Sequence, residues 1–187
     1  MPRALMLTGD AAEELDVMYP LYRVREAGWA CDVAALSRRE VQLVIHDFDP
    51  NSDAYTEKNG RKLPVDLAFA EVEVEKYHAL IIPGGRAPEY IRVDPDVRRI
   101  TEYFFAHDLP VGTICHGPQV PAIYGLLRGR TTAAFPPLQG DMENAGATVV
   151  DEPDCVDGNM VSCRGWPDMP LWSRAFMTVL ERAAVPA

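Results

Sequence analysis

The chain has 187 residues, of which 48% are hydrophobic, and a formal net charge of −10 at pH 7. This length suits one domain over residues 1–187, with a core large enough to need no disulfide or structural metal. The acidic balance, without any basic cluster, argues against nucleic acid and anionic membranes as partners, because both bind proteins largely through neutralisation of phosphate charge.

The four cysteines show neither the paired spacing of a zinc site nor the density of a disulfide scaffold; they are Cys31, Cys115, Cys155 and Cys163. We therefore expect free thiols in a reducing cytoplasm, and neither a metal nor another cofactor. The apolar run at the N-terminus is too short for a signal peptide, and no apolar stretch approaches the roughly 18 residues of a membrane span. The expected location is cytoplasmic.

The first half of the chain begins with a predicted buried strand over residues 4–8 and a helix over residues 12–26. The apolar residues of this helix recur at i, i+3, i+4 and i+7: Leu15, Met18, Tyr19 and Tyr22. Pro20 lies inside the helix and should kink it, because proline lacks an N–H group. Two further strands are predicted over residues 29–36 and 41–45, and the polar residues 49–64 indicate a surface loop.

The second half alternates strands and helices more clearly. An apolar run over residues 78–82 predicts a strand that leads into Gly84 and Gly85. Asp94 and Pro95 are typical of the start of a helix. The further predicted elements are a strand over 109–114, a helix over 117–127, a strand over 131–134, a helix over 138–145, a strand over 147–150, a hairpin over 156–161 and a last helix over 168–183.

This alternation predicts an α/β fold in three layers, a mainly parallel sheet with helices on both faces. Sheets of this type bind ligands beyond the carboxyl ends of their strands. Both Cys115 and the pair Gly84 and Gly85 follow directly after predicted strands. The sequence therefore places candidate functional residues at the ligand-binding edge of the sheet.

Cys115 occupies the turn between a predicted strand and a predicted helix, which is the arrangement of a nucleophile elbow. The N-terminus of the following helix would favour its thiolate form. A lone cysteine is more often a small buried hydrophobic residue. Gly84 and Gly85 leave the backbone free to approach a ligand, although glycine pairs are also common in plain turns.

Four segments together resemble the PfpI/ThiJ superfamily: Pro83–Tyr90, Cys115–Gln119, Asn144–Ala147 and Val156–Asn159. The resemblance implies a flavodoxin-like fold related to class I glutamine amidotransferases, with a reactive cysteine at the elbow. Within the superfamily the chain is most similar to the branch of the PfpI-type intracellular proteases and the glutathione-independent glyoxalases.

The resemblance implies that Cys115 is the nucleophile, that His116 is its acid/base partner and that Glu89 orients His116. In single-domain members this glutamate comes from the neighbouring subunit, so a homo-oligomer, at least a dimer, is expected. From the residues alone, His116 could equally be a helix-start residue, and Glu89 a solvated acid in the first turn of a helix.

A second carboxylate should contact the thiol from the first helix. The corresponding position here is Asp16, where most members carry glutamate, and Glu13 could serve instead or line the pocket. Glu14 is interpreted as a solvated acid. The developing oxyanion would meet main-chain amides of Gly84, Gly85 and His116.

The favoured function is cysteine-dependent chemistry on reactive carbonyls, a glyoxalase or deglycase type of conversion of 2-oxoaldehydes. The alternatives are a PfpI-type intracellular cysteine peptidase acting on peptides, and a cysteine-based stress sensor or chaperone. Amidotransferase activity is least expected, because that family needs a histidine near the end of the chain and residues 165–187 contain none.

Overall fold

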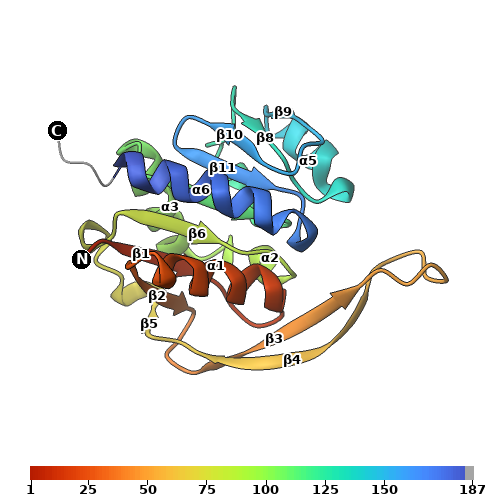
Figure 1. Ribbon diagram of the computed structural model, residues 1–187, viewed down its shortest axis with the longest axis horizontal. Helices are drawn as coiled ribbons and strands as arrows, with labels where there is room; N and C mark the ends of the chain where they lie inside the picture. The colour runs from red at the N-terminus through yellow and green to blue at the C-terminus, as the bar shows by residue number, and fades with distance from the viewer. Residues whose placement is uncertain (184–187) are drawn as a thin grey trace.

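The computed structural model describes residues 1–183, which form a central seven-stranded sheet with helices on both faces (Figure 1). The strand order is β10-β11-β7-β6-β1-β2-β5, and every neighbouring pair is parallel except β10 with β11. The strands of this sheet are β1 (Arg3–Leu7), β2 (Ala30–Ala35), β5 (Leu67–Ala68), β6 (Ala79–Ile82), β7 (Val111–Ile114), β10 (Cys155–Asp157) and β11 (Met160–Cys163).

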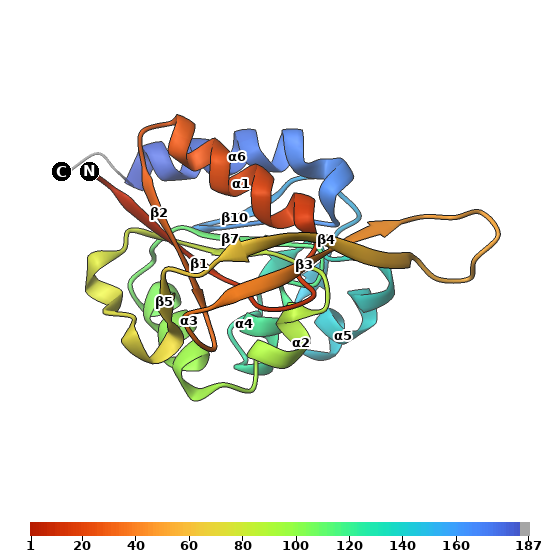
Figure 2. The same ribbon diagram turned by 90° about the horizontal axis from the view of Figure 1, so that it is seen from below.

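The helices complete the three predicted layers. The helices α1 (Glu14–Glu26) and α6 (Met169–Ala183) cover one face of the sheet, and α2 (Ala87–Ile91), α3 (Pro95–Ala106) and α4 (Gln119–Ile123) lie on the other (Figure 2). The central strands β6 and β7 are buried along their whole length. Burial on both faces explains why these strands are continuous apolar runs in the sequence. The predicted flavodoxin-like architecture is confirmed.

The packing of α6 depends on a missing side chain in β7. Trp172 is 1% exposed and stacks on Phe176 with ring centroids 4.9 Å apart. A Cβ atom on Gly112 would lie 2.6 Å from the Trp172 ring. Glycine at this position therefore lets the indole lie directly against the strand, where its Nε1 donates to the Val161 carbonyl at 3.1 Å.

The prediction of which face of the first helix is buried is wrong. Leu15, Tyr19 and Tyr22 are 51%, 41% and 60% exposed, although Met18 packs partly against the core. The residues that α1 buries include Val17, Pro20, Leu21 and Val24. These four also recur at i, i+3, i+4 and i+7, so the helix carries two stripes of the same period and periodicity does not distinguish them. The helix runs through Pro20, whose missing N–H leaves the Asp16 carbonyl without its usual helical donor.

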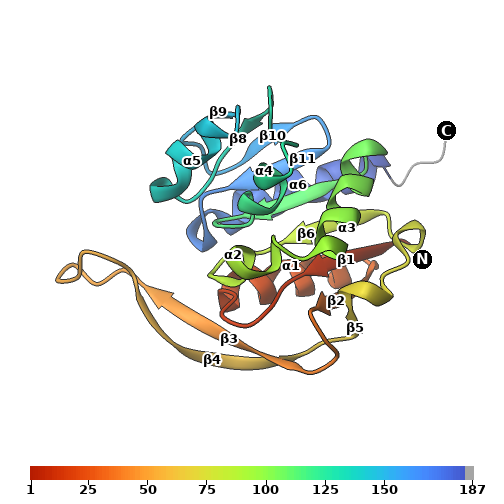
Figure 3. The same cartoon turned by 180° about the vertical axis from the view of Figure 1, so that it is seen from behind.

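The segment predicted as a surface loop over residues 49–64 is largely a strand. The strands β3 (Glu40–Asp47) and β4 (Thr56–Pro64) form a separate antiparallel hairpin (Figure 3). Most β4 side chains are exposed on both faces, so the strand has no alternation of polar and apolar residues. The hairpin joins the body through two backbone bonds to the loop before α1, Ala11 N to Gln42 O at 2.8 Å and Val44 N to Ala12 O at 2.9 Å.

Three smaller elements refine the sequence interpretation. The strands β8 (Thr131–Thr132) and β9 (Thr148–Val149) form their own two-stranded sheet beside α5 (Gln139–Asn144). The strands β10 and β11 form the predicted hairpin, with Gly158 at its turn at φ 58°. The helix after Cys115 is α4, which is shorter than the helix predicted over 117–127, and Gly125 follows it at φ 74°.

No helix among residues 1–183 combines the length and the apolar character needed to cross a membrane.

Candidate active site

Cys115 lies at a sharp turn at the carboxyl end of β7. Its backbone has φ 58°, a left-handed conformation that is uncommon for a residue with a side chain. The turn closes through Gly117 N, which donates to the Ile114 carbonyl at 2.7 Å. A Cβ atom on Gly117 would lie 2.2 Å from the Ile82 carbonyl oxygen, so a side chain there would prevent the turn. This geometry is that of a nucleophile elbow.

The loop after β6 passes directly beside Cys115. A Cβ atom on Gly84 would lie 2.5 Å from Cys115 Cβ and 2.6 Å from Asp16 Oδ2, so glycine alone permits this approach. Gly85 adopts φ +73°. The main-chain amides of Gly85 and His116 lie near the sulfur, and both lower the pKa of the thiol.

Asp16 is the acid beside the thiol. Its side chain is fully buried, and among the described residues neither of its carboxyl oxygens has a side-chain or backbone partner within hydrogen-bond geometry. Burial raises the pKa of Asp16 well above its usual value, the charge on Glu13 raises it further, and the nearby Gly84 amide opposes the shift. This shift favours the protonated carboxyl, which can donate a hydrogen bond.

Glu13 is directed away from the thiol, toward the β3–β4 hairpin. Its Oε1 accepts from Leu15 N at 3.2 Å, and its Oε2 accepts from His46 N at 2.9 Å. The side chain is 1% exposed. Glu14, which we interpreted as a solvated acid, is instead 6% exposed and pairs with Arg61 of β4, so that interpretation is wrong.

His116 contacts the thiol directly. Its Nδ1 lies 3.1 Å from Cys115 Sγ, and its ring stacks on Phe135 with centroids 5.0 Å apart. Burial, with a smaller effect of the charge on His46, lowers the pKa of His116 to about 4. The imidazole is therefore neutral at pH 7 and has the protonation state of a general base.

The expected thiolate is not the resting form of Cys115. Burial raises the pKa of the thiol well above its usual value, and charge on Asp16 would add to this shift. The predicted helix-terminus effect does not overcome burial, because α4 has only five residues. The resting pair is a thiol beside a neutral imidazole, in which the proton moves only when the sulfur reacts.

Glu89 lies in the first turn of α2 and is partly exposed. Within the described part of this single chain, the His116 ring hydrogen-bonds Cys115 and no carboxylate. The predicted contact of Glu89 with His116 is thus not made inside one chain, and its role stays a prediction.

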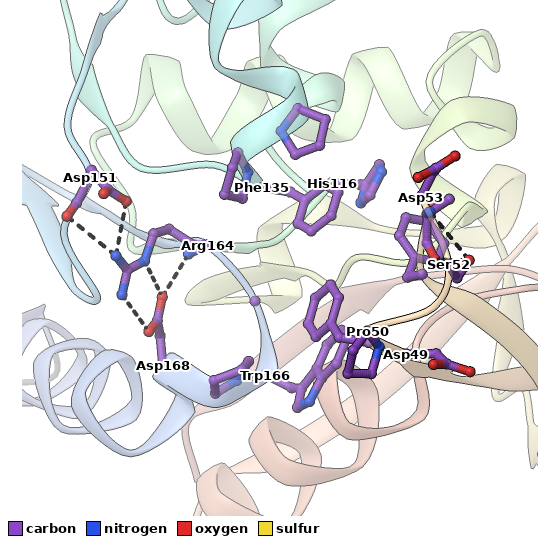
Figure 4. Close-up of a pocket in the computed structure, with 17 residues that line it drawn as sticks. Asp49, Pro50, Ser52, Asp53, His116, Phe135, Asp151, Arg164, Trp166 and Asp168 are labelled. Carbon is purple, nitrogen blue, oxygen red and sulfur yellow. Dashed lines mark hydrogen bonds and ion pairs between the residues drawn. The ribbon is translucent and has the colours of Figure 1, made fainter.

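A cavity of about 990 Å³ opens in front of His116 and Gly165 (Figure 4). Sequence reasoning missed its aromatic lining, in which Phe48 stacks on Trp166 at 5.0 Å and Tyr55 meets the Phe135 ring edge-on at 5.7 Å. Phe48 and Tyr55 come from the hairpin tip: Tyr55 lies within residues 49–64, interpreted as a loop or excursion on the surface, and Phe48 directly precedes them. Aromatic residues in so polar a segment were the available signal.

The cavity wall also holds three charged side chains whose pairing the sequence did not indicate. Arg164 donates Nε and Nη2 to the two oxygens of Asp168 at 2.8 and 2.9 Å, and Nη1 to Asp151 at 2.9 Å (Figure 4). The two carboxylates neutralise the guanidinium. Among residues 1–183, no group of three or more His, Cys, Asp and Glu side chains is placed to hold a metal ion.

Comparisons with known proteins agree with this geometry. The profile of the DJ-1/PfpI family matches residues 2–179. A deglycase of Thermococcus kodakarensis is 38% identical over 96% of this chain and 99% of its own length, and the deglycase PfpI of Pyrococcus furiosus is 34% identical over the same shares.

Solved structures have the same fold. A two-domain protein of Anabaena variabilis with DJ-1/ThiJ/PfpI-like and ferritin-like domains superposes with a TM-score of 0.83 at 26% identity, over 100% of this chain and 50% of that one. DJ-1 of Schizosaccharomyces pombe, at 17% identity, superposes with a TM-score of 0.76 over 98% of this chain and 100% of its own. With an elbow cysteine beside a buried acid and a histidine, and with a family match along nearly its whole length, the chain belongs to the DJ-1/PfpI family.

Proposed function

We propose that this protein is a cysteine-dependent enzyme that converts reactive 2-oxoaldehydes, and their adducts on amines and thiols, into 2-hydroxy acids. The observation that carries the proposal is the contact of Cys115 Sγ with a neutral His116 at 3.1 Å, beside the buried carboxyl of Asp16. The relatives named deglycases support the same type of chemistry.

The first step is addition of the sulfur to an aldehyde. Cys115 Sγ forms a bond to C1 of methylglyoxal while the S–H proton passes to His116 Nδ1 and then to the aldehyde oxygen, which yields a hemithioacetal. The amides of Gly85 and His116 and the protonated Asp16 carboxyl lie around the sulfur and would stabilise the negative charge that develops there.

The next steps move hydrogen between two carbons of the substrate. His116, neutral again, removes the proton from C1, and C2 takes up a proton, which converts the hemithioacetal into a thioester of lactate. Water then cleaves the thioester to release lactate and the free thiol. C1 is oxidised as C2 is reduced, so the sum is methylglyoxal plus water to lactate and no external oxidant is needed. With an amine adduct as substrate, Cys115 Sγ bonds to C1 as the C1–N bond breaks, and the S–H proton passes through His116 to the amine, which leaves; the same hemithioacetal results.

We also propose that Glu89 completes the site of a neighbouring subunit. Among residues 1–183 of its own chain the His116 ring has no carboxylate partner, and Tyr90 and Val93, close to Glu89 in the sequence, are 66% and 74% exposed. Burial of such apolar side chains against a second copy would be favourable. The expected assembly is at least a dimer.

The decisive assay incubates the purified protein with methylglyoxal and measures loss of the carbonyl and formation of lactate. Cys115→Ala should abolish both, whereas Cys155→Ala, at a buried cysteine of β10 away from the elbow, should leave both unchanged. A labelled unfolded peptide incubated in parallel tests the peptidase alternative. Carbonyl conversion that persists in Cys115→Ala would overturn the mechanism.

A further inference from the structure

Next to the active site, Glu13, His46, Glu57 and Arg86 form a continuous ion-pair network. His46 Nδ1 lies 3.0 Å from Glu13 Oε2, and its Nε2 lies 3.0 Å from Glu57 Oε2. Glu57 in turn accepts from Arg86 Nε at 2.8 Å and from Arg86 Nη2 at 2.6 Å. The side chains of His46 and Glu13 are 2% and 1% exposed. The mechanism above does not use His46, Glu57 or Arg86.

The geometry favours a doubly protonated His46. Glu13 Oε1 accepts from the Leu15 amide and Oε2 from the His46 amide, and Glu57 accepts from the Arg86 guanidinium. Ionised carboxylates act only as acceptors. Each ring nitrogen of His46 faces one of these carboxylates, so a ring that donates to both carries two protons. Burial opposes this state, but the hydrogen bonds to Glu13 and Glu57 raise the pKa of His46. In agreement, the Arg86 hydrogen bond is the main cause that lowers the pKa of Glu57 to about 2.

This ion-pair network joins three segments around the active site: the start of α1, the β3–β4 hairpin and the loop after β6. Glu13 caps α1, one helical turn before Asp16, and His46 and Glu57 belong to β3 and β4. Arg86 directly follows Gly85 in the loop after β6, and Arg86 N donates to the Ala11 carbonyl at 2.8 Å.

The contact between Glu13 and the Gly85 loop is close. A Cβ atom on Gly85 would lie 2.3 Å from Glu13 N. A shift of Glu13 therefore moves both the loop that carries the Gly85 amide and the helix turn that carries Asp16.

The groups that face His46 come from every neighbouring element. Glu13 faces it from the helix cap and Glu57 from β4. Tyr55 of the hairpin tip lies with its ring centroid 4.5 Å away, and the same tyrosine meets His116 at 6.2 Å. The positive charge of His46 also reaches His116. The surroundings of His46 thus include two carboxylates and the ring of Tyr55, which in turn contacts the His116 ring beside the thiol.

We propose that His46 is a positioning residue of the active site: as an imidazolium held between Glu13 and Glu57, it neutralises Glu13 and keeps that residue, and with it Asp16 and Gly85, in place beside Cys115. The inference rests on the proposed function for its catalytic meaning. The chemical reactivity of the thiol, however, tests it without any carbonyl substrate.

The test is the rate of Cys115 alkylation by iodoacetamide as a function of pH, in the wild type and in His46→Gln. Glutamine keeps a hydrogen-bonding side chain but carries no charge, so the Glu13 carboxylate loses its neutralising partner and its charge acts more strongly on Asp16, the acid beside the sulfur. We expect alkylation at pH 7 to slow about tenfold, which corresponds to a rise of about one unit in the pKa of the thiol.

Arg61→Gln is the matched control. Arg61 also connects the hairpin to α1, through Glu14, but it is not part of the ion-pair network. If His46 served only to attach the hairpin, the two variants would slow alkylation equally, and that result would overturn the proposal. We expect Arg61→Gln to stay within about twofold of the wild type, because its own side chain is largely exposed.

A second measurement needs no variant to fold. In the wild type with 15N-labelled histidine, one histidine should show both ring nitrogens protonated at pH 7, in contrast to His116. A spectrum in which every histidine is neutral at pH 7 would contradict the proposal. Loss of methylglyoxal conversion in all proteins, with the alkylation pattern as expected, would instead reject the proposed function and leave the role of His46 intact.

Discussion

Replacement of Gly84 by alanine tests whether the close contact of the β6 loop with Cys115 is needed. The new Cβ would lie 2.5 Å from Cys115 Cβ, 2.6 Å from Asp16 Oδ2 and 2.9 Å from the Ile114 carbonyl oxygen. The first and third of these atoms belong to or adjoin the backbone of the elbow, so no flexible side chain can move to make room. Overpacking of this kind costs about 1–3 kcal/mol.

For a domain of this size, 1 kcal/mol shifts the Tm by about 2–4 °C, so Gly84→Ala should lower the Tm by about 2–12 °C. The effect on activity should be larger. Relief of the contact requires a shift of several tenths of an ångström between Gly84, Asp16 and Cys115, and misplacement of reacting groups by about 1 Å costs about 100-fold in rate. We expect kcat for carbonyl conversion to fall by about 10- to 100-fold.

Gly140→Ala provides the control for this experiment. Gly140 lies in α5, and a Cβ atom there would have nothing within 4 Å. Alanine should stabilise this helix by up to about 1 kcal/mol and leave activity unchanged. Thermal unfolding measures the Tm of both variants, and steady-state kinetics measures their kcat for carbonyl conversion. If Gly84→Ala retained the wild-type kcat and Tm, the close contact at the thiol would not be needed for catalysis.

Three further predictions concern the thiol, its base and the assembly. Mild peroxide should oxidise Cys115 to sulfinic acid before the other cysteines, Asp16→Asn should change that rate and Glu14→Gln should not; peptide mass mapping that finds another cysteine oxidised first would contradict the elbow interpretation. Because the pKa of His116 is lowered to about 4, kcat/KM should fall only as the pH drops through about 4, when the base becomes protonated, and an acid limb near the ordinary histidine value of about 6.5 would show that His116 is not the base. Refolding equal amounts of Cys115→Ala and Glu89→Ala together should restore about a quarter of the wild-type activity, since about half the dimers are mixed and each mixed dimer has one intact site. No recovery, with Glu89→Ala inactive alone and mixed dimers shown to form, would place Glu89 in the site of its own chain.

The sequence alone determined the layered fold and the position of the elbow cysteine, Cys115. The buried parallel strands are continuous apolar runs because helices cover both of their faces, and such runs are visible without any structure. The sharp turn at Cys115 is indicated by a strand that ends directly before the cysteine and by a glycine two positions later, which is a purely local pattern. Gly84 and Gly85 follow a strand end in the same local way, so their approach to Cys115 could be expected.

The tertiary structure alone decided which face of α1 is buried and what the β3–β4 hairpin does. Two stripes of equal period run along α1, and only the position of the helix against the body selects Val17 and Leu21 over Leu15 and Tyr22. The β4 strand is polar on both faces, so no pattern in its sequence predicts pairing.

The ion-pair network through His46 depends even more on the tertiary fold. Its members are separated by between 11 and 33 positions along the sequence from one partner to the next. Nothing local to a lone histidine or glutamate in a polar segment indicates that it is buried and paired. Whether such a side chain is solvated or carries a charge into the interior depends on which distant groups the fold brings to it, because burial of a charge is tolerated only with a partner.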